Sequence, residues 1–530
     1  MSAITSSKCP PVLEHSCHGR SARERGDVDA QQVVQSISMG SRVAEDEAKE
    51  LADYFVETEN WRKVYEGEAD IIFAPKGGGK SAIYSMLMSR ESEFFDRGIL
   101  LATAENPKGD TAFAEVEKEP PTTEAEFIGL WKIYFLSIIA QTIADYEVKN
   151  DPAAKLLAKL EEAGLLPSAK APRRQLVRIA MDFVKSFFRP VASVEASVTV
   201  DPSSGVPVFI PKITFAEPSS EQRKAGALYI DELYDFAEDA LERAGYTMWI
   251  LLDRLDIAFA DSVDLEANAL RGLFRVYRDL QTRSFVELKI FLRSDIWESI
   301  TVTGFREASH ITRDLRIEWN ENTLVRLAVQ RLLRSEPLRE HYDVGRDEVL
   351  SEVEKQKAFF YQVFPQQVDQ GSRRPSTIDW CLTRTKDGTG QNAPRELIHL
   401  LTETRNSQLN RFETGQVAPE AGAVFVGQAF KDALPAVSKV RLTQTLYAEH
   451  PSLRPYIEKM EGQKSRHNNA SLASVWGVSE AEADKIAEQL VVVGFFEPRL
   501  GDYWVPFIYR PALEMVQGSA EGVAAASDDE

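Results

Sequence analysis

Cysteine is scarce in this sequence, and long apolar runs are absent. The 530 residues include three cysteines, Cys9, Cys17 and Cys381, with no CxxC pair and no accompanying histidine spacing. Neither a disulfide framework nor a zinc site is therefore expected. No apolar run approaches the roughly 18 residues that a membrane helix needs, and residues 1–25 lack the apolar stretch of a signal peptide. We expect a cytoplasmic protein in a reducing compartment.

Positive charge is also in short supply. The chain has 62 Lys and Arg residues against 82 Asp and Glu residues, which gives a formal net charge of -20. This surplus repels a nucleic-acid backbone at long range, so nucleic-acid binding would depend on a local basic patch. Because runs of charge are usually solvated faces, nucleic acid is a possible but disfavoured partner. The candidate patches are Arg173, Arg174, Arg178, Lys185 and Arg189 in one segment, and Lys464, Arg466 and His467 in another.

The chain divides by composition into five parts. Residues 1–42 are polar without a sustained period and residues 517–530 are small and acidic, so we expect both ends to be disordered. Between them we expect a core, a helical lid and a smaller C-terminal unit. Helical spacing of apolar residues predicts a first helix at 44–55. The expected bounds are 43–318 for the core, with an insertion at about 104–221, then 319–419 for the lid and 420–516 for the C-terminal unit.

Short apolar runs alternate with helical stretches through the core. The predicted strands are IIFA before a glycine-rich turn, GILLAT at 98–103, TMWILLD at 247–253 and VELKIFLRSD at 286–295. Strands of this kind, separated by helices, predict an α/β fold with a parallel sheet covered on both faces. In the insertion, helical stretches precede two period-2 runs at 193–200 and 206–215. The turn residues DPSSG between these runs predict a β-hairpin.

A glycine-rich turn lies between the first strand and the first helix of the core. It fits the P-loop pattern G-x-x-x-x-G-K-[ST], in which backbone N–H groups and a helix N-terminus face phosphate oxygens, Lys neutralises charge and the hydroxyl binds Mg²⁺. The alternative, a flexible loop beside a chance Lys-Ser pair, is disfavoured by the strand–turn–helix context. The candidate nucleotide-binding residues are Ala74, Pro75, Lys76, Gly77, Gly78, Gly79, Lys80, Ser81 and Ala82, with Lys80 also a catalytic candidate and Ser81 also a metal ligand.

A P-loop needs a second carboxylate at the end of a neighbouring strand to hold the metal ion. Asp253 follows the apolar run WILL and is the candidate. The alternative for Asp253 is an ordinary polar residue at the end of a buried strand. Asp256 follows one turn later, and it is either the catalytic base or a helix cap.

Two arginines are placed to contact the terminal phosphate of a nucleotide. Arg293 ends the strand KIFLR, and Arg395 lies just inside the start of the helix in NAPRELIHLL, from which its guanidinium could reach a phosphate from the lid side. A solvated arginine in an exposed helix turn is the alternative for each.

Together these residues resemble bacterial P-loop ATPases of the KAP and STAND type. The resemblance implies a RecA- or AAA+-like sheet, a helical lid and often a C-terminal winged helix. It also implies ATP and Mg²⁺ as ligands, and no Asn-Lys-x-Asp motif for guanine is present. Two positions depart from the pattern: Ala74 replaces Gly, and Arg254 stands where many hydrolysing AAA+ proteins carry Glu. The resemblance is carried by KGGGKSA, the D-x-L-D that ends at Asp256, FLRSD, Asp314, Trp319, Pro394-Arg395-Glu396 and VPFIYRPAL.

The C-terminal unit has the sequence features of a winged helix. SLASVWG is followed by the helix SEAEADKIAEQLVVVGFF and by two short strands around the turn RLGDY. A helix that reads DNA should present Arg, Lys, Asn or Gln. This helix instead offers Glu480, Glu482, Asp484 and Glu488 against Lys485, so we expect a structural or protein-contacting role.

Three functions fit the sequence. The first is a slow ATPase that acts as a switch and controls self-assembly or a protein partner through the lid and the C-terminal unit. The second is a nucleotide-dependent DNA-binding or loading protein resembling origin-recognition AAA+ initiators. The third is a nucleotide-binding scaffold without hydrolysis, which Arg254 suggests. The acidic helix favours the first over the second, and turnover would separate either from the third.

Overall fold

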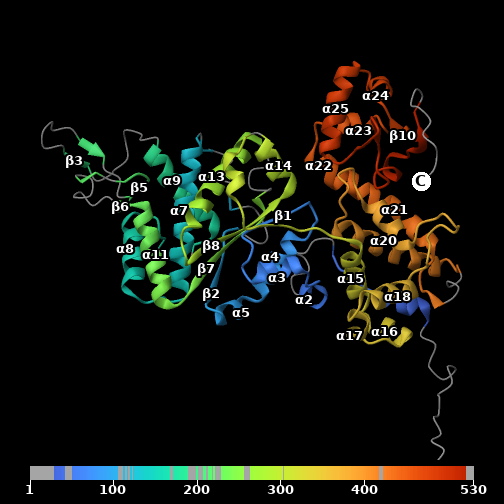
Figure 1. Cartoon of the computed structure of the whole chain (residues 1–530), viewed down its shortest axis with the longest axis horizontal. Helices are drawn as coiled ribbons and strands as arrows, with labels where there is room; N and C mark the ends of the chain where they lie inside the picture. Colours follow the sequence, from blue (N-terminus) through green and yellow to red (C-terminus); the bar gives the residue numbers. More distant parts are fainter. Residues whose placement is uncertain are drawn as a thin grey trace, which may run out of the picture.

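The computed structural model describes residues 29–41, 50–105, 112–113, 116, 120–121, 123–167, 171–188, 198–200, 207–209, 213–217, 219–220, 228–255, 263–302, 304–416 and 422–520. A central sheet lies between a helical insertion on one side and the lid with the C-terminal unit on the other, as Figure 1 shows. The chain therefore has the mixed α/β architecture that the sequence predicts.

The central sheet has five strands in the order β2-β7-β8-β1-β9, and all neighbouring strands pair in parallel. The predicted parallel sheet is thus confirmed, with one strand, β9, that the sequence did not predict. Ala74 at the end of β1 pairs with Arg293 at the end of β8, so the carboxyl ends of these strands are adjacent. The strands are β1 (Ile71–Ala74), β2 (Ile99–Thr103), β7 (Thr247–Leu252), β8 (Val286–Arg293) and β9 (Asp314–Arg316).

Both faces of the sheet are buried, because alternate residues of each strand contribute to different hydrophobic clusters. Ile71 and Phe73 face a cluster that includes helices of the insertion, whereas Ile72 and Ala74 face a second cluster that includes the helix after the P-loop. This two-sided burial explains the continuous apolar runs of the strands. The helices of the core are α2 (Leu51–Tyr54), α3 (Glu59–Tyr65), α4 (Lys80–Ser89), α5 (Glu91–Asp96), α13 (Val263–Leu280), α14 (Ser294–Val302) and η2 (Arg306–His310).

The insertion is helical, and β3 pairs with β4 in antiparallel fashion as the hairpin prediction requires. The expectation that no segment is apolar enough for a membrane is wrong for its longest helix, α7, which by length and composition could cross one. However, 83% of the most apolar 18-residue window of α7 is buried inside the protein. The elements are α7 (Glu124–Asp145), α8 (Asp151–Glu162), α9 (Arg173–Phe188), β3 (Val198–Val200), β4 (Pro207–Phe209), β5 (Ile213–Thr214), β6 (Leu228–Tyr229) and α11 (Ile230–Ala244).

The lid and the C-terminal unit share one hydrophobic cluster, which is separate from the two clusters of the sheet. In the C-terminal unit a four-stranded sheet, β11-β12-β10-β13, accompanies the two helices and the hairpin expected there. The lid helices are α15 (Glu321–Leu332), α16 (Glu336–Tyr342), α17 (Arg346–Leu350), α18 (Val353–Val363), α19 (Thr377–Thr385) and α20 (Pro394–Glu413). The C-terminal elements are α21 (Gly427–Val440), the π-helix η4 (Arg441–Leu446), α22 (Tyr447–Glu449), α23 (Arg454–Glu458), β10 (Lys464–His467), α24 (Asn469–Trp476), α25 (Glu480–Val492), β11 (Glu497–Arg499), β12 (Asp502–Trp504), η5 (Pro511–Leu513) and β13 (Val516–Ser519).

The expectation of disorder over residues 1–42 is wrong for residues 29–41. These include helix α1 (Ala30–Ser36), which Asp29 caps and whose Val33 and Val34 are fully buried in the cluster of the lid. Arg405 of α20 donates hydrogen bonds to the carbonyls of Val34 and Gln35. A short apolar face was enough to order this segment because the lid supplies its packing partner. The helix predicted at 44–55 is described from Glu50 onward, where it is α2; residues 42–49 lie outside the described residues.

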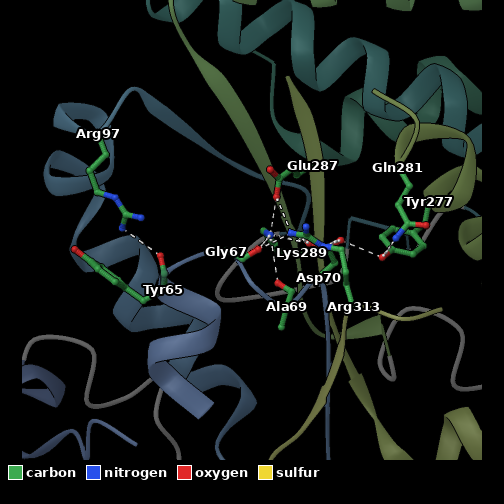
Figure 2. A network of polar contacts seen from close by, with 10 residues as sticks. All are labelled: Tyr65, Gly67, Ala69, Asp70, Arg97, Tyr277, Gln281, Glu287, Lys289 and Arg313. Atoms are coloured by element: carbon green, nitrogen blue, oxygen red, sulfur yellow. Dashed lines mark hydrogen bonds and ion pairs between the residues drawn. The ribbon is translucent and has the colours of Figure 1, made fainter. Parts of the chain in front are cut away.

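A group of charged residues surrounds the buried Lys289 at the amino edge of the central sheet (Figure 2). The Lys289 side chain is fully buried, and its Nζ donates to Asp70 Oδ1 at 2.7 Å and to Glu287 Oε2 at 2.7 Å. Arg313 Nε lies 2.8 Å from Asp70 Oδ2, and the Tyr277 hydroxyl donates to the same oxygen at 3.0 Å. The network joins β8 to the residues just before β1 and β9, so it holds three strands in register.

Candidate functional site

A cavity of about 320 Å³ lies between the P-loop and the lid. Its volume is at the lower end of the range typical of small-molecule sites. The polar part of its wall includes the P-loop, residues from the ends of β7 and β8, and Arg331 and Arg395 of the lid. The other part is apolar, with Leu51, Tyr54, Phe55, Val56, Ile317, Leu327 and Ile398.

The predicted P-loop has the backbone geometry that its glycines allow. Gly77 and Gly79 have φ angles of +74° and +101°, in the left-handed region that favours glycine. A Cβ on Gly78 would lie 2.9 Å from the carbonyl oxygen of Pro75, so a larger residue would have to displace the backbone. Helix α4 begins at Lys80 directly after this turn, and residues Lys76 to Ile83 line the cavity. A helix N-terminus and successive backbone N–H groups therefore border the cavity, as phosphate binding requires.

Ala74, the departure from the P-loop pattern, sits at the buried end of β1. It is 1% exposed, it belongs to one of the sheet clusters, and it is not among the described residues with positive φ. The turn therefore does not need glycine here, because the chain is still extended at this position. Lys80 Nζ donates to the Ala74 carbonyl oxygen at 3.4 Å.

Asp253 is 5% exposed, directly follows β7 and lines the cavity together with Ser81. Burial, together with the negative charges of Asp253 and Glu105, raises the pKa of the Tyr84 hydroxyl on α4. The described residues contain no group of three or more His, Cys, Asp or Glu side chains that could hold a metal ion. A hydroxyl and one carboxylate are nevertheless hard oxygen ligands of the type that Mg²⁺ uses when a bound phosphate and water complete its shell. Ser81 and Asp253 fit that role.

Arg254 lines the cavity at the position where hydrolysing AAA+ proteins often have Glu, and its φ of 62° is in the left-handed region. A non-glycine residue in this conformation costs roughly 1–2 kcal/mol, and such strain is found at functional sites. Asp256, the candidate catalytic base, lies outside the described residues.

Arg293 also lines the cavity, and its guanidinium is held by two carboxylates. It donates to Asp295 at 3.1 and 2.6 Å, and to Glu449 of α22 at 3.1 Å. Lys76 of the P-loop forms an ion pair with the same Glu449. Burial and the positive charges of Arg293 and Lys76 lower the pKa of the adjacent His450, although Asp295 opposes the change. The C-terminal unit thus reaches the P-loop, which the sequence did not indicate.

Arg395 lies in the first turn of α20 and lines the cavity from the lid side. A Cβ on Gly77 would lie 2.9 Å from Arg395 Cβ, so the lid backbone approaches the P-loop as closely as a glycine permits. The cavity is thus lined by all the predicted nucleotide-binding residues except Ala74 and Pro75.

Among the lining residues that were not predicted as site residues, Trp319, Arg331 and Tyr54 make specific contacts. Trp319 Nε1 donates to the Gly78 carbonyl oxygen at 2.8 Å and thereby fixes the P-loop. Arg331 donates to the Met39 carbonyl, and its guanidinium lies 4.2 Å from the centre of the Tyr54 ring. Trp319 was part of the family resemblance, but neither Arg331 nor Tyr54 belongs to a local motif. Their positions in the site depend on how the lid packs against residues 39–41 and 50–58.

The two predicted basic patches differ in their exposure to solvent. Arg466 and His467 are 8% and 1% exposed, and Arg466 Nε donates to Asp502 at 2.8 Å, so the second patch is not a surface for nucleic acid. In the first patch Arg173 donates to Gln141 at 2.7 Å, whereas Arg178 is exposed. Arg189 lies outside the described residues.

No protein-family model matches the chain, and no curated protein matches it either. Among solved structures, similarity is found to the Walker-type ATPase PABY2304 of Pyrococcus abyssi, with 14% identity, a TM-score of 0.38 and coverage of 87% of this chain and 96% of the other. The Aeropyrum pernix ORC1 protein in complex with DNA has 12% identity, a TM-score of 0.35 and coverage of 89% and 96%. The Aeropyrum pernix ORC2 protein, solved as ADPNP-ADP complexes, has 11% identity, a TM-score of 0.28 and coverage of 90% and 96%. All three TM-scores lie below 0.5.

Proposed function

We propose that this protein is an ATP- and Mg²⁺-binding P-loop ATPase of slow turnover that works as a cytoplasmic molecular switch. The observation that carries the proposal is the charge of the cavity between the P-loop and the lid. Among the described residues that line it, six are positively charged and one, Asp253, is negatively charged. The cations are Lys76, Lys80, Arg254, Arg293, Arg331 and Arg395. A wall in which cations outnumber carboxylates suits a polyphosphate.

The two parts of the wall suit the two ends of a nucleotide. The phosphates would lie at the N-terminus of α4, with Lys80 against their oxygens and Arg293 and Arg395 on opposite sides of the terminal one. Ser81 and Asp253 would hold Mg²⁺, which neutralises phosphate charge when bound. The apolar wall around Tyr54, Phe55 and Val56 would take the base. Asp256 remains our candidate for the catalytic base.

The switch would act through the lid and the C-terminal unit, because both contact the P-loop side of the cavity. The switch would control either the assembly of homo-oligomers or the binding of a protein partner. The exposed side chains of Glu480, Glu482 and Glu488 on α25 give a DNA-reading role little support. A second candidate is a nucleotide-binding scaffold that does not hydrolyse, and the observation that favours it is Arg254 in the cavity wall. A phosphate-release assay at saturating ATP and Mg²⁺ separates the two.

The test of the site is Lys80→Ala in an equilibrium titration with a fluorescent ATP analogue. Charge-assisted hydrogen bonds are worth about 1.5–3 kcal/mol, so affinity should fall by roughly ten- to 150-fold. Lys149→Ala is the matched control, because Lys149 is a lysine whose side chain is 78% exposed on the insertion, where it pairs with Glu147. Equal affinities of the Lys80→Ala and Lys149→Ala proteins would rule out the proposed site.

A further inference from the structure

One carboxylate from the C-terminal unit lies against two cations of the nucleotide cavity. Glu449 ends α22, and its Oε2 lies 3.1 Å from Arg293 Nη2 while its Oε1 pairs with Lys76. The three side chains are only 14% to 29% exposed. Lys76 and Arg293 line the cavity, but Glu449 is not among the lining residues, so the carboxylate approaches the two cations from the side of the C-terminal unit.

The two cations occupy the place where a terminal phosphate would need charge. Arg293 ends β8 directly beside Ala74, the last residue of β1, and Lys76 follows Ala74 by two residues in the P-loop. Both therefore lie at the carboxyl edge of the sheet, on neighbouring strands. A carboxylate and a phosphate oxygen make the same kind of charge-assisted bond to these groups. A site that already holds one anion binds a second less well, because the second must displace or repel the first.

Glu449 is not needed to balance Arg293. Asp295, in the first turn of α14, binds the same guanidinium through two hydrogen bonds, and these hold the pKa of Asp295 below its usual range despite its burial. Arg293 would keep this partner if Glu449 moved away. The Glu449 contact can therefore break without removing the charge partner of Arg293.

The segment that carries Glu449 is anchored at its other end to the lid. Arg441 begins the π-helix η4, and its guanidinium pairs with Asp387 at 2.8 Å and with Glu396 at 3.1 Å, all largely buried. Glu396 follows Arg395, which lines the cavity. Residues 441–449 thus connect an ion pair beside the lid arginine to an ion pair at the P-loop. π-Helices are rare and often mark functional sites, because their looser turn can rearrange.

We propose that Glu449 competes with the terminal phosphate of a bound nucleoside triphosphate for Lys76 and Arg293, so that the site distinguishes triphosphate from diphosphate. This inference rests on the proposed nucleotide binding. A diphosphate leaves Glu449 in place and the C-terminal unit held against the P-loop. A triphosphate takes over the two cations, Glu449 withdraws, and the segment 441–449 is released at its P-loop end while Arg441 keeps its lid partners.

The test compares ADP with a non-hydrolysable ATP analogue in binding titrations of the full chain. In Glu449→Gln, which keeps the shape and removes the charge, triphosphate affinity should rise by roughly tenfold, a coupling of ordinary size for linked sites, while ADP affinity stays within about twofold. Glu458→Gln is the control, because Glu458 is a half-exposed glutamate of the same unit that pairs with Arg454. An unchanged ratio of the two affinities in Glu449→Gln overturns the inference.

Amide hydrogen exchange of residues 441–449 gives a second readout, independent of affinity. In the wild-type protein, exchange should be faster with the ATP analogue than with ADP, and in Glu449→Gln it should be fast with both. Equal exchange of the wild-type segment in the two nucleotides would show a fixed salt bridge and overturn the inference. If the wild-type protein binds neither nucleotide, the proposed function itself fails; if it binds both and only the ratio is unaffected by Glu449→Gln, the proposed function stands and the competition does not.

Discussion

The two edges of the central sheet carry charged groups of different kinds. At the amino edge, Lys289 and Arg313 are matched by Asp70 and Glu287 within the chain (Figure 2). At the carboxyl edge, cations outnumber carboxylates in the cavity wall. A buried charge is costly unless its partners are built in, and removing one partner leaves an uncompensated charge. A surplus of one sign beside a cavity instead favours a ligand of the opposite sign. We therefore expect changes at the amino edge to affect stability and changes at the carboxyl edge to affect nucleotide binding.

The largest effect expected from this comparison is at the amino edge. Asp70→Ala removes the carboxylate shared by Lys289 and Arg313, and breaking a buried ion pair typically costs about 3–5 kcal/mol. Urea unfolding should show this loss, whereas nucleotide affinity of the folded protein should be unchanged. Glu147→Ala, which breaks an exposed pair with Lys149, is the control and should change stability by less than about 1 kcal/mol. A large loss of affinity in Asp70→Ala would mean that the two edges do not act separately.

Gly78→Val in the P-loop should lower nucleotide affinity, whereas Asp70→Ala should lower stability. The added side chain meets the Pro75 carbonyl at 2.9 Å and the Ala74 Cβ at 3.0 Å, so the turn must shift. A misfit of about 1–3 kcal/mol corresponds to a loss of nucleotide affinity of roughly five- to 150-fold. Gly345→Ala is the control, because a Cβ there would have its nearest neighbour at 3.7 Å. Titration of both variants with the fluorescent ATP analogue decides, and equal affinities would contradict the role of the turn.

Asp253→Asn should remove the negative charge that faces the metal ion at the carboxyl edge. We expect Mg²⁺-dependent nucleotide binding or turnover to fall by about tenfold, because a neutral amide does not compensate the charge of the cation. Asp256→Asn should have a smaller effect on binding. Parallel titrations with and without saturating Mg²⁺ measure both. The reverse ranking would mean that the roles of the two carboxylates are exchanged.

A smaller effect is expected for Trp319→Phe, which removes the hydrogen bond to Gly78 and keeps an aromatic ring. A single hydrogen bond contributes about 0.5–1.5 kcal/mol, so affinity should fall roughly two- to tenfold. Trp380→Phe in lid helix α19 is the control, because this tryptophan is buried but not among the residues that line the cavity. If the two variants bind equally well, the Trp319 contact does not organise the P-loop.

The weakest interaction is expected with duplex DNA, which the protein should bind weakly or not at all at physiological salt. A site with six to ten phosphate contacts loses about 10³ to 10⁵ in affinity between low and moderate salt, so only a dense basic surface would retain binding. Any binding should map to Arg173, Arg174 and Arg178. A mobility-shift series across salt, with and without ATP, tests this. Salt-resistant binding that is lost on changes in the C-terminal unit would favour the initiator-like function.

The phosphate end of the candidate site could be predicted from the sequence. The predicted P-loop consists of consecutive residues, and in P-loops the phosphate is contacted by backbone N–H groups whose direction the local glycine pattern fixes. The position of Asp253 after a buried strand could be predicted because the sequence changes from apolar to polar residues where the strand ends. The parallel sheet followed from the same alternation of apolar strands and helices. Each of these features depends on neighbours in the sequence.

The rest was decided by the tertiary structure. The order of residues 29–41, the apolar wall at Tyr54 and the contact of Glu449 with Lys76 all join segments far apart in the chain. No local pattern marks a residue whose partner is hundreds of positions away. Such residues acquire their role only when the lid and the C-terminal unit form their shared hydrophobic cluster and pack against the sheet, because that packing determines which side chains are buried and which charges meet.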